Sequence, residues 1–175
     1  AIDFALNNCS FRAGAALNVI LITDEDRDVA SGAAGLNYNN ILAALDGKNA
    51  LLNAVVNASF VSGDGSAAGI DGTDGYYADG SGGYTVSNAA TSNSGYGTTV
   101  ADYVDLAIES GGAAWNLNQL RAGGNAANSF TAAFVDIKVQ EIIIQPPTNG
   151  TPDGGSTLVL LGAALAGFAA LRRKL

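Results

Sequence analysis

Histidine is absent from this chain of 175 residues, and cysteine occurs once, at Cys9. Within the chain, this excludes a Ser-His-Asp or Cys-His catalytic arrangement. It also excludes a disulfide framework and a zinc site built from Cys and His. We interpret the single thiol as a small, buried apolar residue.

Basic residues are scarce: 8 Lys and Arg stand against 16 Asp and Glu, which gives a net charge of -8. None occurs between Lys48 and Arg121, and three of the eight are the adjacent Arg172, Arg173 and Lys174. A surface this acidic repels phosphate backbones, so we expect no nucleic-acid partner.

The N-terminus lacks the basic and then apolar stretch of a secretory signal peptide. The chain begins with Ala1 and has no initial Met. Two interpretations stay open: a leader has been removed, or the chain is a fragment of a longer product.

An uninterrupted apolar run is present near the C-terminus, where residues 158–171 carry no polar side chain. A helix of this length spans about 21 Å, against about 30 Å for the hydrocarbon core of a bilayer. The run is therefore marginal as an anchor, but as a core helix it would have no polar face for water. The three cations that follow favour a cytoplasmic C-terminal end. We expect residues 157–171 to engage a membrane.

The complete tail resembles a PEP-CTERM sorting signal, in a variant that has Pro-Asp where that family has Pro-Glu-Pro. Its three parts occur in order: a short motif, the apolar run and a basic stop. The motif residues are Pro152, Asp153, Gly154, Gly155 and Ser156, and the stop residues are Arg172, Arg173 and Lys174. The resemblance implies a bacterial protein that is exported, enters the inner membrane transiently, is cut by an exosortase, and ends at the cell surface or outside the cell. Proteins of this family come from bacteria that make extracellular polysaccharide.

The first half of the body shows an alternation of strand and helix. The stretch "LNVILIT" (17–23) predicts a strand buried on both faces, ending in the acidic "DEDRD". Residues 37–57 have helical apolar spacing, with a possible break at Asp46-Gly47. The stretch "ASFVSG" (58–63) predicts a second strand, and this order favours an α/β fold with parallel pairing.

A glycine-rich segment, residues 62–97, follows. We interpret it as a surface insertion, because it offers little apolar surface to offset the entropy of ordering. It contains a candidate hairpin, with "GYYA" and "GYTV" as strands around "DGSGG". Its aspartates offer oxygen ligands for calcium, but their spacing matches neither an EF-hand loop nor a nonapeptide repeat. A solvated loop is the preferred interpretation of these residues, which are Asp64, Asp71, Asp74 and Asp79.

The remaining body predicts three more elements. Residues 98–112 form a helix that ends at Gly111-Gly112, and "AAWNLNQL" (113–120) is a strand that enters a short helix. In residues 128–147, Phe130, Phe134 and Ile137 form one stripe, which predicts a closing helix that stops at the two prolines. The alternation around 137–139 leaves a strand as an alternative.

This order of elements resembles the C-terminal half of a von Willebrand factor type A domain, through the strand that ends in Thr23-Asp24 and the helix that ends in Gly-Gly. The resemblance implies a Rossmann-like α/β fold, with a mainly parallel sheet and flanking helices, in which Asp24 lies next to a metal. The Asp-x-Ser-x-Ser motif of that family is missing, so the domain is expected to be truncated at its N-terminus and the metal site to be incomplete. The cofactor stays open, with a divalent cation (Mg²⁺ or Ca²⁺) as the candidate. The alternative for Asp24 is a solvated acidic turn.

Three regions result: a type A-like domain over 1–145, a linker with the sorting motif over 146–156, and a sorting helix with a basic end over 157–175. We expect a non-enzymatic binding or adhesion protein at the cell surface, whose partners are the export machinery, an exosortase, the membrane, and an extracellular protein or polysaccharide. One alternative is a structural protein that stays tail-anchored in the inner membrane. Another is a carboxylate-dependent enzyme.

Overall fold

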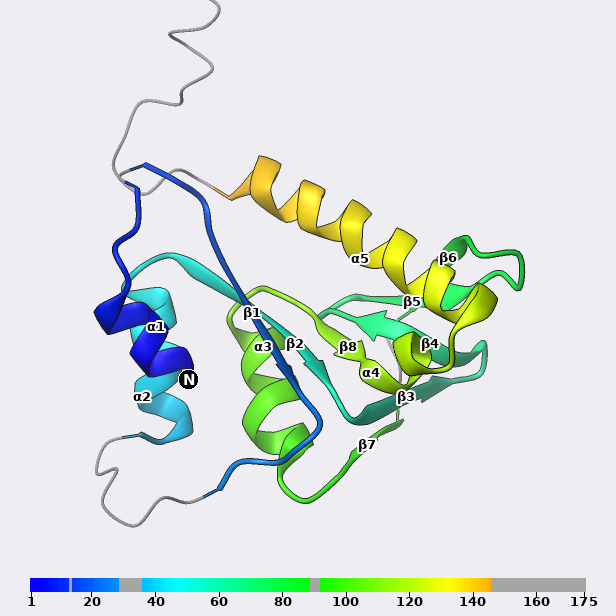
Figure 1. Cartoon of the computed structure of the whole chain (residues 1–175), viewed down its shortest axis with the longest axis horizontal. Helices are drawn as coiled ribbons and strands as arrows, with labels where there is room; N and C mark the ends of the chain where they lie inside the picture. The colour runs from blue at the N-terminus through cyan, green and yellow to red at the C-terminus, as the bar shows by residue number, and fades with distance from the viewer. Residues whose placement is uncertain (13, 29–35, 89–91, 146–175) are drawn as a thin grey trace, which may run out of the picture.

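The computed structural model describes residues 1–12, 14–28, 36–88 and 92–145 (Figure 1). Its helices are α1 (Ile2–Asn8), α2 (Tyr38–Asp46), the π-helical turn η1 (Val100–Val104), α3 (Asp105–Glu109), α4 (Leu117–Arg121) and α5 (Gly124–Ile144). Its strands are β1 (Leu17–Thr23), β2 (Ala50–Val56), β3 (Ala58–Ser62), β4 (Gly65–Ile70), β5 (Asp74–Ala78), β6 (Tyr84–Asn88), β7 (Ser92–Gly95) and β8 (Ala114–Asn116).

All eight strands belong to one mixed sheet, with the order β1-β2-β8-β4-β3-β7 and with β5 and β6 continuing from β4. Only the pairs β1–β2 and β2–β8 are parallel, whereas the other five pairs are antiparallel. The α/β class is confirmed, but the prediction of a mainly parallel sheet is wrong. The connections from β2 to β6 are at most five residues long, which is too short for the crossover that parallel neighbours need.

The predicted strand at 17–23 is confirmed as β1, and α2 carries the chain from β1 to its parallel neighbour β2. The prediction that this strand is buried on both faces is wrong, because Ile20 and Ile22 are exposed. β1 lies at the end of the strand order. Its other face packs through Val19 and Leu21 against the core beneath α1 and α2.

The predicted helix over 37–57 ends at the break, since α2 stops at Asp46 and residues 50–56 form β2. Asn49, between the two elements, has a φ of +49°, which suits a turn better than a helix. β2 is a central strand buried on both faces. Because both faces of such a strand are buried, its apolar residues do not alternate with polar ones. Its sequence therefore fits the period of a helix as well as that of a strand.

The glycine-rich segment is not a surface insertion, because residues 62–97 supply β4, β5, β6 and β7 of the sheet. Tyr76 and Tyr77 of β5 are buried, and the predicted hairpin is confirmed as β5–β6. Gly69 shows what the small residues permit: a Cβ there would lie 2.4 Å from Cε3 of Trp115. The segment thus has few large apolar side chains because its backbone packs closely against aromatic rings.

Two cores lie on opposite faces of the sheet, because Leu52, Ala54 and Val56 of β2 belong to one and Val55 to the other. The first packs α1, α2 and α3 against Leu52 and its neighbours in the sheet. The second lies under α5, where Trp115 contacts Phe130 and Phe134, with ring centroids 5.8 and 5.0 Å away.

The later elements agree largely with prediction. The helix before Gly111-Gly112 appears as η1 followed by α3, "AAWNLNQL" as β8 and α4, and the closing helix as α5. The alternative of a strand around 137–139 is wrong, since this stretch lies within α5. The prediction of a buried Cys9 is also wrong, because its side chain is exposed next to the end of α1.

Candidate functional site

The acidic stretch after β1 joins three parts of the fold. Asp24 Oδ2 accepts a hydrogen bond from Arg121 Nη2 of α4 at 2.7 Å. Asp26 Oδ2 accepts from the backbone N–H of Thr98, at 3.3 Å, just before η1. Arg27 Nε lies 3.3 Å from Asp102 Oδ2, on η1. These contacts fix the carboxyl end of β1 against α4 and η1.

Asp24, the predicted metal ligand, is therefore paired with a cation of the protein itself. The hydrogen bond from Arg121 lowers the pKa of the Asp24 carboxyl below its ordinary value. Within the described ranges, no three or more Cys, Asp and Glu side chains gather in a way that could hold a metal ion. Mg²⁺ and Ca²⁺ need several oxygen ligands at once, and the surroundings of Asp24 do not fit that requirement.

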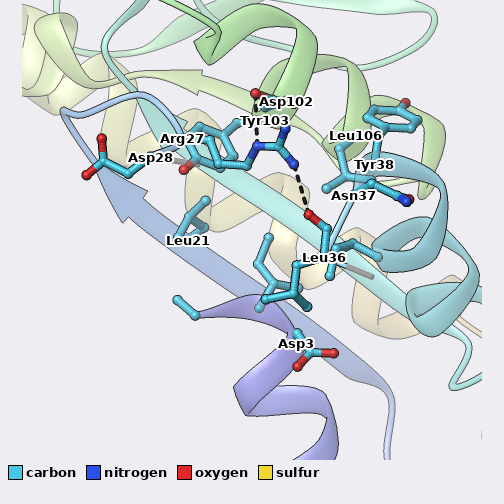
Figure 2. Close-up of a pocket in the computed structure, with 13 residues that line it drawn as sticks. Asp3, Leu21, Arg27, Asp28, Leu36, Asn37, Tyr38, Asp102, Tyr103 and Leu106 are labelled. Atoms are coloured by element: carbon cyan, nitrogen blue, oxygen red, sulfur yellow. Dashed lines mark hydrogen bonds and ion pairs between the residues drawn. The ribbon is translucent and has the colours of Figure 1, made fainter. Parts of the chain in front are cut away.

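A cavity of about 300 Å³ opens beside this stretch, between β1, α2 and η1 (Figure 2). Leu21, Ile41 and Leu106 form part of its apolar lining. Arg27 reaches across it, where its Nη1 donates to the carbonyl oxygen of Leu36 at 3.1 Å while its Nε faces Asp102 (Figure 2). This is the carboxyl end of the parallel strand β1, where open α/β sheets place their ligands.

The polar groups around the cavity combine donors and acceptors. Tyr38 donates its hydroxyl proton to Glu109 Oε2 at 2.5 Å, and burial, followed by this bond, raises the pKa of Tyr38 above its usual range. Tyr103 also lines the cavity, and burial, followed by the charge of Asp102, raises its pKa. Both phenols therefore stay neutral at physiological pH. The lining offers hydroxyl groups, carboxylates and one guanidinium above an apolar floor.

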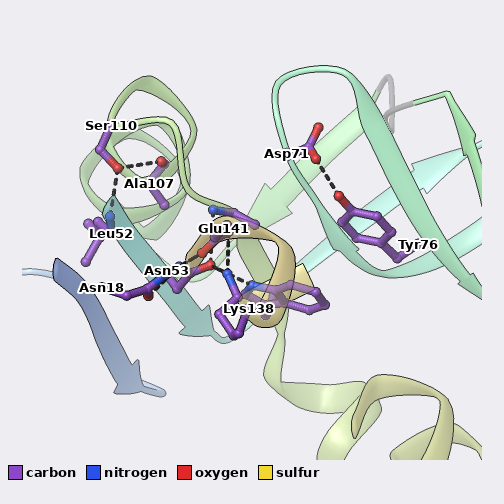
Figure 3. A network of polar contacts seen from close by, with 11 residues as sticks. Asn18, Leu52, Asn53, Asp71, Tyr76, Ala107, Ser110, Lys138 and Glu141 are labelled. Atoms are coloured by element: carbon purple, nitrogen blue, oxygen red, sulfur yellow. Dashed lines mark hydrogen bonds and ion pairs between the residues drawn. The ribbon is translucent and has the colours of Figure 1, made fainter. Parts of the chain in front are cut away.

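A second polar cluster, buried between the sheet and α5, is centred on Asn53 of β2 (Figure 3). Asn53 Oδ1 accepts from Trp115 Nε1 at 3.1 Å and from Lys138 Nζ. Its amide nitrogen donates to Asn18 Oδ1 and to Glu141 Oε2, at 2.9 Å in each case. One asparagine thus joins β1, β2, β8 and α5.

Glu141 and Lys138 complete this network as an ion pair one turn apart on α5, with Nζ and Oε1 separated by 2.5 Å. Asn18 Nδ2 donates to Glu141 Oε2 at 2.5 Å. Burial lowers the pKa of the Lys138 ammonium, and the hydrogen bond to Glu141 opposes that shift. Since the charged groups bond to one another, we interpret the network as a structural connection between α5 and the sheet.

Asp24 was singled out from the sequence, but neither the role of Arg27 nor the network around Asn53 was predicted. A signal for the buried network is present: Asn53 interrupts an apolar strand, and Lys138 and Glu141 lie on the apolar stripe of a helix. Arg27 carries no such signal, because it stands in an acidic stretch that also reads as a solvated turn.

Comparison with known proteins identifies the C-terminal tail. Residues 152–175 match the VPDSG-CTERM motif, a sorting signal of the PEP-CTERM type. The predicted sorting signal is confirmed, and it indicates export and a surface or extracellular location. No curated protein and no solved structure matches the chain. The von Willebrand factor type A resemblance is therefore not supported by any match.

The sorting motif 152–156, the predicted membrane helix 157–171 and the basic stop 172–174 lie outside the described residues. Within the part of the chain that the structure does describe, no helix is long and apolar enough to cross a membrane. The 21-residue helix α5 is included in that finding.

Proposed function

We propose that this chain is an exported protein that an exosortase cuts at its C-terminal sorting signal, leaving a binding domain at the cell surface or outside the cell. The match of residues 152–175 to a sorting-signal motif carries the first part of this proposal. In that view, Pro152 and Asp153 lie in the recognition motif, the run 158–171 enters the inner membrane, and Arg172, Arg173 and Lys174 stay on the cytoplasmic side.

Fractionation of a producing bacterium tests the sorting step. The mature protein is expected outside the inner membrane, with an intact mass that ends near residues 152–156. A Pro152→Ala/Asp153→Ala variant is expected to accumulate uncut in the inner membrane, whereas Thr148→Ala, a control in the linker, is processed normally. A wild-type product that keeps its tail in the inner membrane would favour a permanent tail anchor. A product that stays in the cytoplasm would overturn export.

For the body, residues 1–145, we propose binding without catalysis, with the cavity beside Arg27 as the site. What supports this is the combination of an apolar floor, tyrosine side chains and hydrogen-bonding groups of both kinds, which suits a ligand rich in hydroxyl groups. An extracellular polysaccharide is the ligand class we favour, and an extracellular protein loop is the alternative. The adhesion role implied by the type A resemblance belongs to this part of the proposal.

Affinity electrophoresis in gels that contain the bacterium's own extracellular polysaccharide tests the binding role. Asp28→Asn and Tyr103→Phe are expected to weaken the retardation, while Asp64→Asn, in the turn between β3 and β4 and outside the cavity lining, is expected to leave it unchanged. Equal retardation of all variants would remove the cavity as the site. Release of new reducing ends from the polysaccharide by the wild type would favour the enzyme alternative.

A further inference from the structure

An apolar face of the sheet beside α5 has no covering element among the described residues. In the register of β1 with β2, Ile20 is paired with Asn53 and Ile22 with Val55. Paired residues point to the same face of a sheet, and Val55 belongs to the core under α5. Ile20 and Ile22 therefore point to the α5 side, yet they are 48% and 66% exposed.

The outward side of α5 continues this apolar surface. Val135, Val139 and Ile142 follow a spacing of four and three residues and are each about half exposed, at 51%, 50% and 54%. The bond between Asn18 and Glu141 places the C-terminal half of α5 next to the start of β1. We call the surface formed by Ile20, Ile22, Val135, Val139 and Ile142 the uncovered face.

The end of α5 brings the tail to this face. Gln145 Nε2 donates to the carbonyl oxygen of Leu17 at 3.1 Å, so residue 146 follows directly beside the first residue of β1. Residues 146–157, which lead to the apolar run, can extend over about 40 Å, and the run 158–171 spans about 21 Å as a helix. β1, with seven residues, is about 23 Å long. The run and the strand that it would cover therefore match in length.

The distribution of charge indicates in which direction the run lies along β1. Residues 1–145 contain 15 acidic and 5 basic residues, whereas the tail ends in Arg172, Arg173 and Lys174. The carboxyl end of β1, opposite the place where residue 146 follows, carries the acidic stretch 24–28, which includes four carboxylates and Arg27. A run laid along β1 from its first residue to its last would bring the basic stop to that stretch.

We infer that, in the uncut chain in water, the run 158–171 packs on the uncovered face and places Arg172, Arg173 and Lys174 next to residues 24–28. The sorting helix then completes the domain as a covering helix until a membrane takes it. Removal of the tail exposes Ile20 and Ile22, so cleavage changes the surface that the mature protein presents. This docking does not depend on the identity of the processing enzyme or on the polysaccharide site.

Cysteine cross-linking of the purified full chain, in detergent-free buffer, tests this docking. In a Cys9→Ser background, Ile20→Cys and Ala164→Cys are expected to form a disulfide within one chain on mild oxidation. The control pair, Val61→Cys with Ala164→Cys, is expected not to, because Val61 is exposed on β3, away from β1. Replacing Arg172, Arg173 and Lys174 by Gln is expected to reduce the yield of the first pair several-fold.

A second measurement keeps the result interpretable if the cross-link is weak. A water-soluble maleimide is expected to label Ile20→Cys several-fold faster when Leu161→Asp and Leu165→Asp break the apolar run. Equal labelling rates, without the intramolecular disulfide, would overturn the inference. A disulfide that joins two chains of the Ile20→Cys variant would assign the face to a second copy of the chain. Protection only in the presence of phosphatidylglycerol vesicles would assign it to lipid. The disulfide between two chains and the protection by vesicles alone would each overturn the inference as well. None of these measurements tests sorting in the cell.

Discussion

At the scale of single residues, Asn53 shows how a polar side chain organises an apolar fold. Its side-chain oxygen Oδ1 accepts from the backbone N–H of Ala113 at 3.2 Å as well as from the side chains of Trp115 and Lys138. In a buried site, a polar group without a partner is costly, whereas a satisfied network fixes one arrangement of the elements around it. Asn53 therefore helps define how α5 lies on the sheet.

Removing the ammonium group of this network is expected to be destabilising. Lys138→Met keeps the apolar stem but leaves the Glu141 carboxylate without its ion pair, so we expect the free energy of unfolding to fall by about 3 kcal/mol. Urea denaturation followed by tryptophan fluorescence measures it, because Trp115 is the only tryptophan and lies in the network. Lys48→Met, outside the network, is the control. Adding Glu141→Leu to Lys138→Met should recover part of the loss, and no recovery would argue against an ion pair.

Two glycines offer a matched test of packing at the same scale. A Cβ at Gly69 would lie 2.4 Å from Cε3 of Trp115, whereas a Cβ at Gly72 would meet Cγ2 of Ile108 at 3.6 Å, an ordinary contact. We expect Gly69→Ala to lower the free energy of unfolding by about 2 kcal/mol and Gly72→Ala to change it little. Urea midpoints of the two variants compare them directly. Equal midpoints would show that Trp115 can move aside.

At the scale of elements, the turn between β5 and β6 depends on one carboxylate. Asp79 Oδ1 accepts from the backbone N–H groups of Ser81 and Gly83, at 2.7 and 3.0 Å. These bonds, with that of Ser81 first, lower the pKa of Asp79 below its ordinary value of 3.8. The ionised side chain of Asp79 thus stabilises the turn of the hairpin.

The pH dependence of that stabilisation has a definite sign. Because the pKa of Asp79 is lower in the folded state, its contribution is complete above pH 3.8 and is lost as the pH falls through the lowered value. Asp79→Ala is therefore expected to be less stable than wild type at pH 6, and the difference is expected to shrink below pH 3.8. Urea denaturation of both proteins between pH 2.5 and 6, in steps of roughly half a unit, measures it. A difference that does not change with pH would mean that the charge contributes nothing.

Elements also differ in how far their sequences determine them. β1, α5 and the β5–β6 hairpin were predicted, because each carries a local signal: a β-branched run, a helical stripe, or glycines between two short strands. The residues of β2 were assigned to a helix, since a strand buried on both faces has no alternation to distinguish it. β4 was missed because Ala68 is buried in the core of Trp115 and Phe130, two aromatic residues that lie far away in the sequence.

At the scale of the whole molecule, charge separates the body from the tail. Residues 1–145 carry a net charge of -10, and residues 146–175 carry +2. Residues 1–145 therefore repel polyanions, whereas the positively charged tail is attracted to residues 1–145. The same asymmetry supports the orientation in which the tail enters a membrane.

This asymmetry predicts weak binding to nucleic acid. In an electrophoretic mobility assay at about 50 mM salt, where charge attraction is strongest, the full chain is expected not to shift a DNA duplex. Replacing Arg172, Arg173 and Lys174 by Gln should change nothing in this assay. A shift that disappears with added salt would show a basic surface that the distribution of charges does not reveal.

The sequence by itself identified the sorting signal, which indicates export. A sorting signal is read as a linear order of motif, apolar run and basic stop, so no folding is needed to recognise residues 152–175. Only the tertiary structure decided that the glycine-rich segment is part of the sheet, that Asp24 is paired with Arg121, and that Ile20 and Ile22 are exposed within the part of the chain that the structure describes. Each of these results depends on contacts between residues that are distant in the chain, and such contacts have no signature in local composition or spacing.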